Sequence, residues 1–353
     1  MPEKMKHFKV ALLGASGFAG AELLRRLLPH PHVEVVRVCA ADHIGEPVAS
    51  AHPHLEGATD LVFEDLPPEA AARGADLVVM GLPHQASVDL VQALQGSDVR
   101  VLDLSGAFRL ADPEAYAQYY GTAHPCPALL SQFVYGLPEL NREAIRGARY
   151  VASPGCFATT AELALLPLAR AGLLRGRVDL VGVTGSSGAG ATPSPTTHHP
   201  VRANNLRSYS PLTHPHSPEI EATLLKAGGR ELELAFVPVS APLTRGIFVT
   251  AFARVPAELS QQELEELYHS TYAEDPFVRV PARRLPEVVA VSGSNYAEAS
   301  ARLGAVRGGE REVVCFAATD NLVKGGAGQA VQNLNLMLGF AEDMMLEDRG
   351  GYP

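Results

Sequence analysis

A cysteine that could act as a nucleophile stands in the stretch SPGCFATT, residues 153–160. Cys156 follows a proline and a glycine, and the apolar, helix-forming residues FATTAELALL come after it. We therefore expect Cys156 at or just before a helix N-terminus, where exposed N–H groups and the helix dipole stabilise a thiolate. Cys39 and Cys315 lie inside the strand-like sequences VVRVCA and EVVCFAA, so we predict that they are buried and structural.

Two histidines and a glutamate in one segment could move a proton at such a thiol. The segment THPHSPEIEATLLK contains His214, His216 and Glu219, and the glutamate opens a predicted helix after a proline. His216 and Glu219 are three residues apart, so the carboxylate could orient the imidazole for acid or base catalysis. We therefore prefer His216 to His214 as the proton-transfer partner. An H-x-H metal site and ordinary surface histidines are the alternatives. We predict no metal, because no cysteine or close acidic cluster completes a ligand set.

A glycine-rich turn near the N-terminus could bind the phosphates of a dinucleotide. The stretch KVALLGASGFAGAELLRRLL has glycines at G-x-x-G-x-x-G spacing between an apolar strand and a helical pattern. Glycine lets backbone N–H groups approach a pyrophosphate, and the helix start adds its positive dipole. Because of this strand–turn–helix context, we predict cofactor contacts from Gly14, Ser16, Gly17, Phe18, Ala19 and Gly20.

The end of the second predicted strand, HVEVVRVCA, helps to choose the cofactor. Cys39 and two alanines stand where an NAD enzyme would carry an acidic residue, while Asp42 comes late and Arg37 is near. This pattern favours NADP. The runs GADLVVMGLPH and DVRVLDLSG indicate further parallel strands of a doubly wound sheet. Pro83 and His84 end one of them, where a nicotinamide would lie; an exposed loop histidine is the alternative for His84.

Two later loops of small residues could approach the same cofactor. The stretch VGVTGSSGAGATPSP brings Ser187 and Gly188 into a loop, which could also be a flexible linker. In TDNLVKGGAGQAVQNLNLML, Asn321 and Lys324 lie in a glycine-rich turn before a predicted amphipathic helix. We expect Ser187, Gly188 and Asn321 to contact the cofactor. For the substrate or its phosphate we expect contacts from Arg109, Arg202, Arg207 and Lys324.

The bulk composition limits the classes of function. With 353 residues the chain is long enough for two domains, and its net charge of −10 argues against general nucleic-acid binding. No apolar run reaches the roughly 18 residues of a membrane span, and the first residues lack a signal-peptide core. The four cysteines form no C-x-x-C pair, which fits a reducing compartment. We therefore expect a cytoplasmic protein.

A dinucleotide domain joined to an activated thiol suggests that the thiolate forms a thioester, which a hydride reduces to an aldehyde. A set of stretches in a fixed order also matches a known family, among them GASGFAGAELLRRL, DLSGAFR, YGLPELNRE, SPGCFATT, HPHSPEIE, PLTRGIF and DNLVKGGAGQAVQNLN. The chain resembles N-acetyl-γ-glutamyl-phosphate reductases over nearly its whole length. The resemblance implies NADPH as cofactor, Cys156 as nucleophile, the 214–219 segment as acid/base, and dimers or tetramers joined through the sheet of the second domain.

Departures from the family pattern suggest a particular substrate. Phe18 and Phe157 replace usual tyrosines, and Ala191 replaces a usual basic residue. The stretch TPSPTTHHPVRANNLRSYS looks like the branch that acts on aminoadipate or glutamate held on a small acidic carrier protein. Residues 180–218 contain no aspartate or glutamate, which suits an acidic partner. We expect Arg202 and Arg207 to supply charge to that docking surface; a loop buried near the active site is the alternative.

The predicted fold is α/β, with a Rossmann-type doubly wound domain and an α+β catalytic domain built on an antiparallel or mixed sheet, as in semialdehyde dehydrogenases. We place the first domain at residues 1–154 and 325–353 and the catalytic and oligomerisation domain at 155–324. The preferred function is NADPH-dependent reduction of a carrier-linked acyl phosphate. Free N-acetyl-γ-glutamyl phosphate is the alternative substrate, and a non-catalytic NADP-sensing regulator or a cysteine hydrolase are the alternatives of other classes.

Overall fold

The computed structural model describes residues 7–352, and the chain divides into two compact units. Unit 1 consists of Met1–Pro113, Ala123–Pro154 and Gly326–Glu347. Unit 2 consists of Glu114–Thr122, Gly155–Gly325 and Asp348–Pro353. This division differs from the expected domain boundaries at residues 114–122, at Gly325 and at residues 348–353, which all belong to unit 2.

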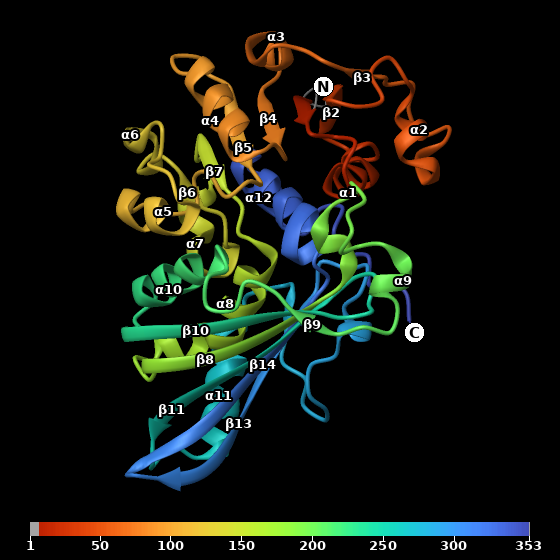
Figure 1. Cartoon of the computed structure of the whole chain (residues 1–353). Helices are drawn as coiled ribbons and strands as arrows, with labels where there is room; N and C mark the ends of the chain where they lie inside the picture. The colour runs from red at the N-terminus through yellow and green to blue at the C-terminus, as the bar shows by residue number, and fades with distance from the viewer. Residues whose placement is uncertain (1–6, 353) are drawn as a thin grey trace, which may run out of the picture. The chain divides into compact units, whose positions relative to one another are not determined.

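Unit 1 is built on a parallel seven-stranded sheet with the order β3-β2-β1-β4-β5-β7-β6 (Figure 1). Its strands are β1 (Phe8–Leu13), β2 (Val33–Cys39), β3 (Phe63–Glu64), β4 (Leu77–Met80), β5 (Arg100–Asp103), β6 (Val134–Tyr135) and β7 (Tyr150–Ala152). Its helices are α1 (Phe18–Leu27), α2 (Val48–Ala51), α3 (Pro68–Ala72), α4 (His84–Ala93), α6 (Pro127–Leu130), α7 (Pro138–Ile145) and α12 (Gly328–Leu338). The strand order extends on both sides of β1, as in doubly wound folds.

The central strands of this sheet are apolar throughout because helices cover both faces of a doubly wound sheet. All four residues of β4 are buried, and so are the last four of β1. This pattern confirms the predicted Rossmann-type sheet.

The glycines of the first turn have different structural duties. Gly14 has φ +78°, and a Cβ there would lie 2.3 Å from the Gly81 carbonyl oxygen at the end of β4. A Cβ on Gly20 would lie 2.1 Å from the Ala15 carbonyl oxygen, which also accepts a 2.8 Å hydrogen bond from His52. A Cβ on Gly17 would meet nothing closer than 3.9 Å. Gly17 therefore leaves open space above the start of α1, whereas Gly14 and Gly20 allow backbone segments to pack closely.

The last helix, α12, is buried on every side, so the prediction of an amphipathic helix is wrong. Its polar side chains replace water with protein partners. The Asn333 amide donates to the Gly136 carbonyl (2.9 Å), and the Asn335 amide donates to the Met344 carbonyl (2.9 Å). The helix contacts α1, α7 and β5 inside unit 1. The asparagines of α12 therefore form hydrogen bonds inside the protein and do not face solvent.

Unit 2 is built on a mixed seven-stranded sheet with the order β12-β13-β14-β11-β8-β10-β9. Its strands are β8 (Arg175–Thr184), β9 (Arg207–Ser208), β10 (Arg230–Ser240), β11 (Ile247–Pro256), β12 (Val278–Arg279), β13 (Ala297–Arg307) and β14 (Glu310–Thr319). Its helices are α8 (Cys156–Arg170), α9 (His199–Arg202), α10 (His216–Lys226) and α11 (Gln261–Thr271), and most of α5 (Pro113–Tyr120). Short 3-10 turns occupy η2 (Ser186–Ala189) and η3 (Val288–Ala290), and a π-helical turn occupies η4 (Val323–Ala327). The mixed sheet confirms the predicted fold of the second domain.

Helix α8 forms the centre of unit 2 and continues through Pro167. A proline in a helix leaves the carbonyl four residues earlier without its N–H donor. That carbonyl belongs to Leu163, and the hydroxyl of Tyr272 donates to it. The hydroxyl of Tyr268 donates to the next carbonyl, Ala164, at 2.5 Å. Two tyrosines thus satisfy the backbone that the proline opens.

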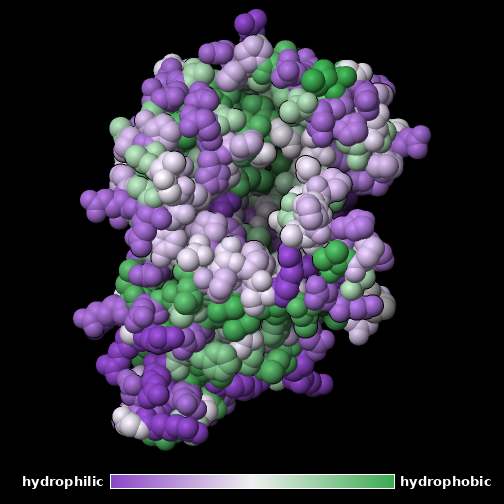
Figure 2. All heavy atoms as spheres, in the orientation of Figure 1, coloured by the Kyte–Doolittle hydropathy of each residue, from purple (hydrophilic) through white to green (hydrophobic). Residues whose placement is uncertain are grey.

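The two faces of this sheet differ in cover. Helices α8, α10 and α11 pack on the sheet, whereas alternate residues of β8 and β11 are open to solvent. Val181 is 38% exposed and Phe252 is 48% exposed. Figure 2 shows hydrophobic side chains gathered over this part of unit 2.

The glycine turn gives a test of the packing argument. Gly20→Ala should lower the free energy of unfolding by about 1–3 kcal/mol or more, because the new methyl group overlaps backbone that cannot move away. Gly17→Ala should change it by less than about 1 kcal/mol, because its methyl group enters open space. Urea unfolding of both variants measures the difference. Equal stabilities would contradict the assigned packing role of Gly20.

Candidate active site

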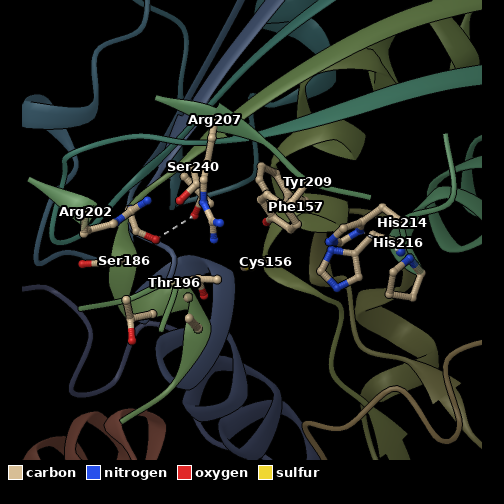
Figure 3. A pocket seen from close by; sticks show the side chains of 16 residues that line it. Cys156, Phe157, Ser186, Thr196, Arg202, Arg207, Tyr209, His214, His216 and Ser240 are labelled. Atoms are coloured by element: carbon tan, nitrogen blue, oxygen red, sulfur yellow. Dashed lines mark hydrogen bonds between the residues drawn. The ribbon is translucent and has the colours of Figure 1, made fainter. Parts of the chain in front are cut away.

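A cavity of about 370 Å³ in unit 2 brings together several predicted site residues (Figure 3). Cys156, His214, His216, Arg202 and Arg207 all line it. Its size falls within the range of small-molecule sites, roughly 300–1,000 Å³. In Figure 3 the two arginines lie on one side of Cys156 and the two histidines on the other.

Cys156 is the first residue of α8, as the sequence predicts. It is half-buried, and Gly155 before it is the N-cap with no side-chain cap. The N–H groups at this helix start and the helix dipole favour a thiolate. Burial instead raises the pKa of Cys39 to about 11 and of Cys315 to about 12, so those thiols stay protonated. Their predicted burial inside strands is confirmed.

Two close approaches to glycine shape the surroundings of the thiol. A Cβ on Gly325 would lie 2.9 Å from the Cβ of Cys156. A Cβ on Gly155 would lie 2.2 Å from Nε2 of His216. Only glycine at these two positions allows the backbone after β14 to approach Cys156 and the imidazole of His216 to lie against the cysteine turn.

Glu219 connects the histidine helix to the cysteine turn. Helix α10 begins at His216, so Glu219 lies in its first turn. The prediction that Glu219 opens this helix is therefore wrong. The buried Glu219 accepts a 2.7 Å hydrogen bond from the backbone N–H of Gly155. This bond fixes the residue before the nucleophile relative to α10. The expected orientation of the His216 ring by Glu219 stays a prediction.

His214 is buried among aromatic rings and differs from His216 in its surroundings. Its ring is 5.3 Å from that of Phe236 and 4.7 Å from that of His216. Burial lowers the pKa of His214 to about 4. Its Nδ1 accepts a hydrogen bond from the backbone N–H of His216 (3.2 Å). A neutral His214 therefore holds the start of α10, which leaves His216 as the better candidate for proton transfer.

The two arginines of the cavity differ in exposure. Arg202 ends the short helix α9 and is only 9% exposed, so its expected place on an exposed docking surface is wrong. Arg207 begins β9 and is half-buried. Tyr209 lies near both: burial raises the pKa of its hydroxyl, the Cys156 thiol adds to the rise, and the positive charges of Arg202 and Arg207 oppose it.

Other residues predicted in unit 2 lie in a buried network. The side chains of Asn321 and Ser187 are hydrogen-bonded (3.0 Å), and Asn321 also accepts from the N–H of Gly246 (2.7 Å). Gly188 lines the cavity beside this network. Lys324 is fully buried, with its ammonium group 5.9 Å from the centroid of the Phe277 ring. The cavity brings in Gly188 and does not include Lys324, Ser187 or Asn321 among its lining residues.

The predicted residues of unit 1 lie in two groups. Gly14, Ser16, Gly17, Phe18, Ala19 and Gly20 form the turn between β1 and the first turn of α1. Gly17 is the N-cap of α1 without a side-chain cap, so its first N–H groups face the open space described above. This arrangement suits a pyrophosphate.

Arg37 and Arg109 bind backbone carbonyls of unit 1. Arg37 lies two residues before the end of β2 and donates to the carbonyls of Ala71 (2.8 Å) and Arg73 (3.2 Å). Arg109 donates to the carbonyls of Ser153 (2.8 Å) and Leu104 (2.7 Å). These bonds give both guanidinium groups a structural duty, and their predicted ligand contacts stay predictions.

Pro83 and His84 lie at the start of α4, just after β4. Pro83 is the N-cap of that helix and His84 is its first residue. Nε2 of His84 accepts a 3.2 Å hydrogen bond from the N–H of Gly106 after β5. Burial lowers the pKa of His84, and the charge of Arg109 lowers it further. His84 is thus a neutral histidine bonded to the neighbouring strand end.

Sequence reasoning missed several residues of the cavity, namely Tyr209, Ser186, Thr196, Thr197 and Ser240. Tyr209 stands two residues after Arg207 in the stretch NNLRSYS, which gave the one available signal. Ser240 ends β10 and pairs with Arg207 across the sheet, a contact that depends on strand pairing far apart in sequence.

Within residues 7–352 no group of three or more His, Cys, Asp or Glu side chains is placed to hold a metal ion. In the same residues no helix has both the length and the apolar character needed to cross a bilayer.

The low pKa of His214 predicts a pH dependence of stability. In the unfolded chain His214 binds a proton below about pH 6.5, whereas in the folded chain it does so only near pH 4. The contribution of His214 to the free energy of unfolding is therefore complete above pH 6.5 and decreases as the pH falls from 6.5 towards 4. The slope should reach at most about 1.4 kcal/mol per pH unit. His214→Asn keeps an acceptor near Nδ1 but removes the titration, so urea unfolding should show a shallower slope. The exposed His199→Asn is the control; equal slopes in the wild type and in His214→Asn would contradict the assignment.

Comparison with known proteins places the chain among enzymes of known chemistry. The family model "Semialdehyde dehydrogenase, NAD binding domain" matches residues 9–148, and "Semialdehyde dehydrogenase, dimerisation domain" matches residues 156–321. An aspartate semialdehyde dehydrogenase II structure from Vibrio cholerae has a TM-score of 0.72 at 16% identity, covering 95% of this chain and 99% of that chain. This structural likeness confirms the predicted fold.

Curated relatives define the family more closely. N-acetyl-gamma-glutamyl-phosphate reductase of Methanopyrus kandleri is 43% identical over 350 residues, covering 98% of this chain and 99% of that protein. LysW-L-2-aminoadipate 6-phosphate reductase of Deinococcus radiodurans is 39% identical over 350 residues, covering 98% of each. The resemblance predicted from the sequence is therefore confirmed. The chain belongs to the semialdehyde dehydrogenase family, in the group of acyl phosphate oxidoreductases that contains the N-acetyl-gamma-glutamyl-phosphate reductases.

Proposed function

We propose that this protein uses NADPH to reduce an amino-acid acyl phosphate to a semialdehyde through a thioester on Cys156. The observation that carries the proposal is the position of Cys156, at the N-terminus of α8, in a cavity shared with His216. The first-turn N–H groups that favour the thiolate also suit the oxyanion that forms when it attacks an acyl carbon.

Each step then has a group in this chain. The Cys156 thiolate attacks the acyl carbon, the bond from that carbon to the phosphate oxygen breaks, and inorganic phosphate leaves. The nicotinamide, when bound, supplies the hydride that reduces the thioester carbon. His216 donates a proton to the resulting alkoxide and takes it back as the C–S bond breaks, which releases the aldehyde and the thiolate. Glu219 and His214 position the two helix starts that carry these groups.

For the cofactor we propose NADP rather than NAD. The turn with the open Gly17 suits a pyrophosphate, and β2 ends at the buried Cys39, followed by the buried Ala40, so that no acidic residue stands at the end of this strand to bind the ribose hydroxyls. Arg37 is bonded to carbonyls, so the proposal rests on the missing acidic residue and not on that arginine. Titration with NADPH and NADH tests the preference.

For the substrate we propose an aminoadipyl or glutamyl phosphate carried on a small acidic protein. The Deinococcus relative is named for a LysW-linked substrate, and other relatives are named for the N-acetyl-glutamyl compound. Two features of this chain favour the carrier. Residues 180–218 contain no carboxylate side chain, and that segment exposes the apolar side chains Val201 (49%), Leu206 (65%) and Leu212 (61%). Exposed apolar residues in a segment without acidic groups suit an acidic protein partner.

We also propose that two copies of the chain pair through the uncovered face of the unit 2 sheet, where Val181 and Phe252 are exposed. The matching family domain is described as a dimerisation domain. None of the four cysteines forms a disulfide, which is consistent with the proposed cytoplasmic location.

Cys156→Ser tests the covalent step. The variant should bind NADPH as the wild type does and lose turnover by several orders of magnitude, because a serine alkoxide is hardly populated at neutral pH. Single-turnover mixing with acyl phosphate and NADPH, followed by nicotinamide absorbance, measures the loss. Cys126→Ser, at a half-buried cysteine outside the cavity, is the matched control. A variant that retains more than about a tenth of the rate would refute the thioester route.

Leu206→Asp tests the carrier. The new charge lies in the segment without acidic residues, so it should raise KM for the carrier-linked substrate and leave kcat nearly unchanged. The wild-type KM for that substrate should rise with salt, because ions screen charges over about 8–10 Å at physiological strength. Free N-acetylglutamyl phosphate should respond to neither change, and Leu285→Asp, at another exposed leucine, is the control. Equal effects on the two substrates would remove the carrier and leave the N-acetyl substrate.

A further inference from the structure

Arg202 is a buried cation without a partner. Its Nε and Nη2 atoms are buried without a hydrogen bond, and no carboxylate of the described residues forms an ion pair with it. Buried arginines are ordinarily paired, because the uncompensated charge costs several kcal/mol. The side chain belongs to the lining of the cavity that contains Cys156.

A second arginine increases this imbalance of charge. Burial lowers the pKa of Arg202, and the like charge of Arg207 lowers it further, so the two guanidinium groups repel each other. The lining of the cavity includes no aspartate or glutamate. Neutral hydroxyl groups complete this side of the cavity, from Thr196, Tyr209 and Ser240. The cavity therefore has two positive charges and hydroxyl donors but no acidic residue to balance them, so a bound anion would neutralise the excess positive charge.

We propose that Arg202 and Arg207 form an anion subsite that binds an oxyanion group of the substrate while Cys156 holds its acyl carbon. The inference rests on the proposed function for the identity of the substrate. Both carboxylate and phosphoryl oxygens fit the planar donor fork of a guanidinium. An acyl phosphate of an acidic amino acid has one group of each kind. A guanidinium could bind either the carboxylate or the phosphoryl group. The reverse reaction, in which the enzyme makes the acyl phosphate, distinguishes the two possibilities.

In that direction the semialdehyde, inorganic phosphate and the oxidised cofactor are separate substrates with separate KM values. A subsite for the carboxylate affects KM for the semialdehyde, and a subsite for the phosphoryl group affects KM for phosphate. The probes are N-acetylglutamate semialdehyde and inorganic phosphate. Arg202→Gln should raise one of these KM values by roughly 10- to 100-fold, the loss expected for hydrogen bonds to a charged group. Arg202→Lys should recover part of the effect because it keeps the charge.

Direct binding separates this proposal from the proposed function. Calorimetric titration of Cys156→Ser with N-acetylglutamate and with inorganic phosphate requires no turnover. One of the two anions should bind to Cys156→Ser and bind at least tenfold more weakly to the double variant with Arg202→Gln. Arg283→Gln, at an exposed arginine outside the cavity, should change neither affinity.

The outcomes are distinct. Loss of anion binding together with a raised KM supports the subsite and identifies the group that it binds. Loss of anion binding in a protein that proves to have no reductase activity would keep the subsite and remove the proposed function. Unchanged affinities and unchanged KM values in a folded Arg202→Gln variant would overturn the proposal, because the guanidinium would then have no ligand. A matching circular dichroism spectrum and melting temperature establish that the variant is folded.

Discussion

The hydrogen bond from the Gly155 N–H to the Glu219 carboxylate is the constraint on which the candidate site depends. It joins the residue before the nucleophile to the first turn of the helix that carries His216, across 64 residues of sequence. Loss of the hydrogen-bond donor to such a buried carboxylate would lower the free energy of unfolding, because the carboxylate would stay buried without this partner. This buried contact therefore helps to fix the relative position of the thiol and the imidazole.

Glycine makes that closeness possible. At residue 155 the missing side chain admits the imidazole, and at residue 325 it admits the cysteine. Substitution at either position would force apart groups that have to meet for the proposed chemistry. The N-terminal turn uses glycine in the same double sense, since Gly14 and Gly20 allow backbone to pack while Gly17 keeps a space open. At Gly155 and Gly325 the backbone thus approaches the reactive side chains more closely than any other residue would allow.

The parts of the structure that follow local rules could be predicted from the sequence. The apolar runs predict the parallel sheet, and the proline and glycine before Cys156 predict its place at a helix start. The arginines and α12 show the limit. Arg202 looks like a surface residue in sequence, and only the fold of the 191–209 segment reveals that it is buried. In the sequence the asparagines of α12 resemble a solvated helix face. Their hydrogen-bond partners, Gly136 and Met344, lie outside the helix, so the sequence of the helix does not reveal them. Burial and long-range partners depend on tertiary packing, which periodicity does not report.

The complete burial of α12 has a consequence for the order in which the chain acquires its structure. Unit 1 begins at the N-terminus, but the helix that fills its interior starts about 170 residues after Pro154, where the earlier part of the unit ends. A ribosome that adds roughly 5–20 residues per second needs on the order of 10–35 s to make that stretch. During this interval the parallel sheet lacks its interior helix and exposes apolar surface, whereas the strands of unit 2 are all synthesised before α12. Unit 2 can therefore fold first, and the nucleotide-binding half has to wait for the end of translation, which makes it the part most in need of a chaperone.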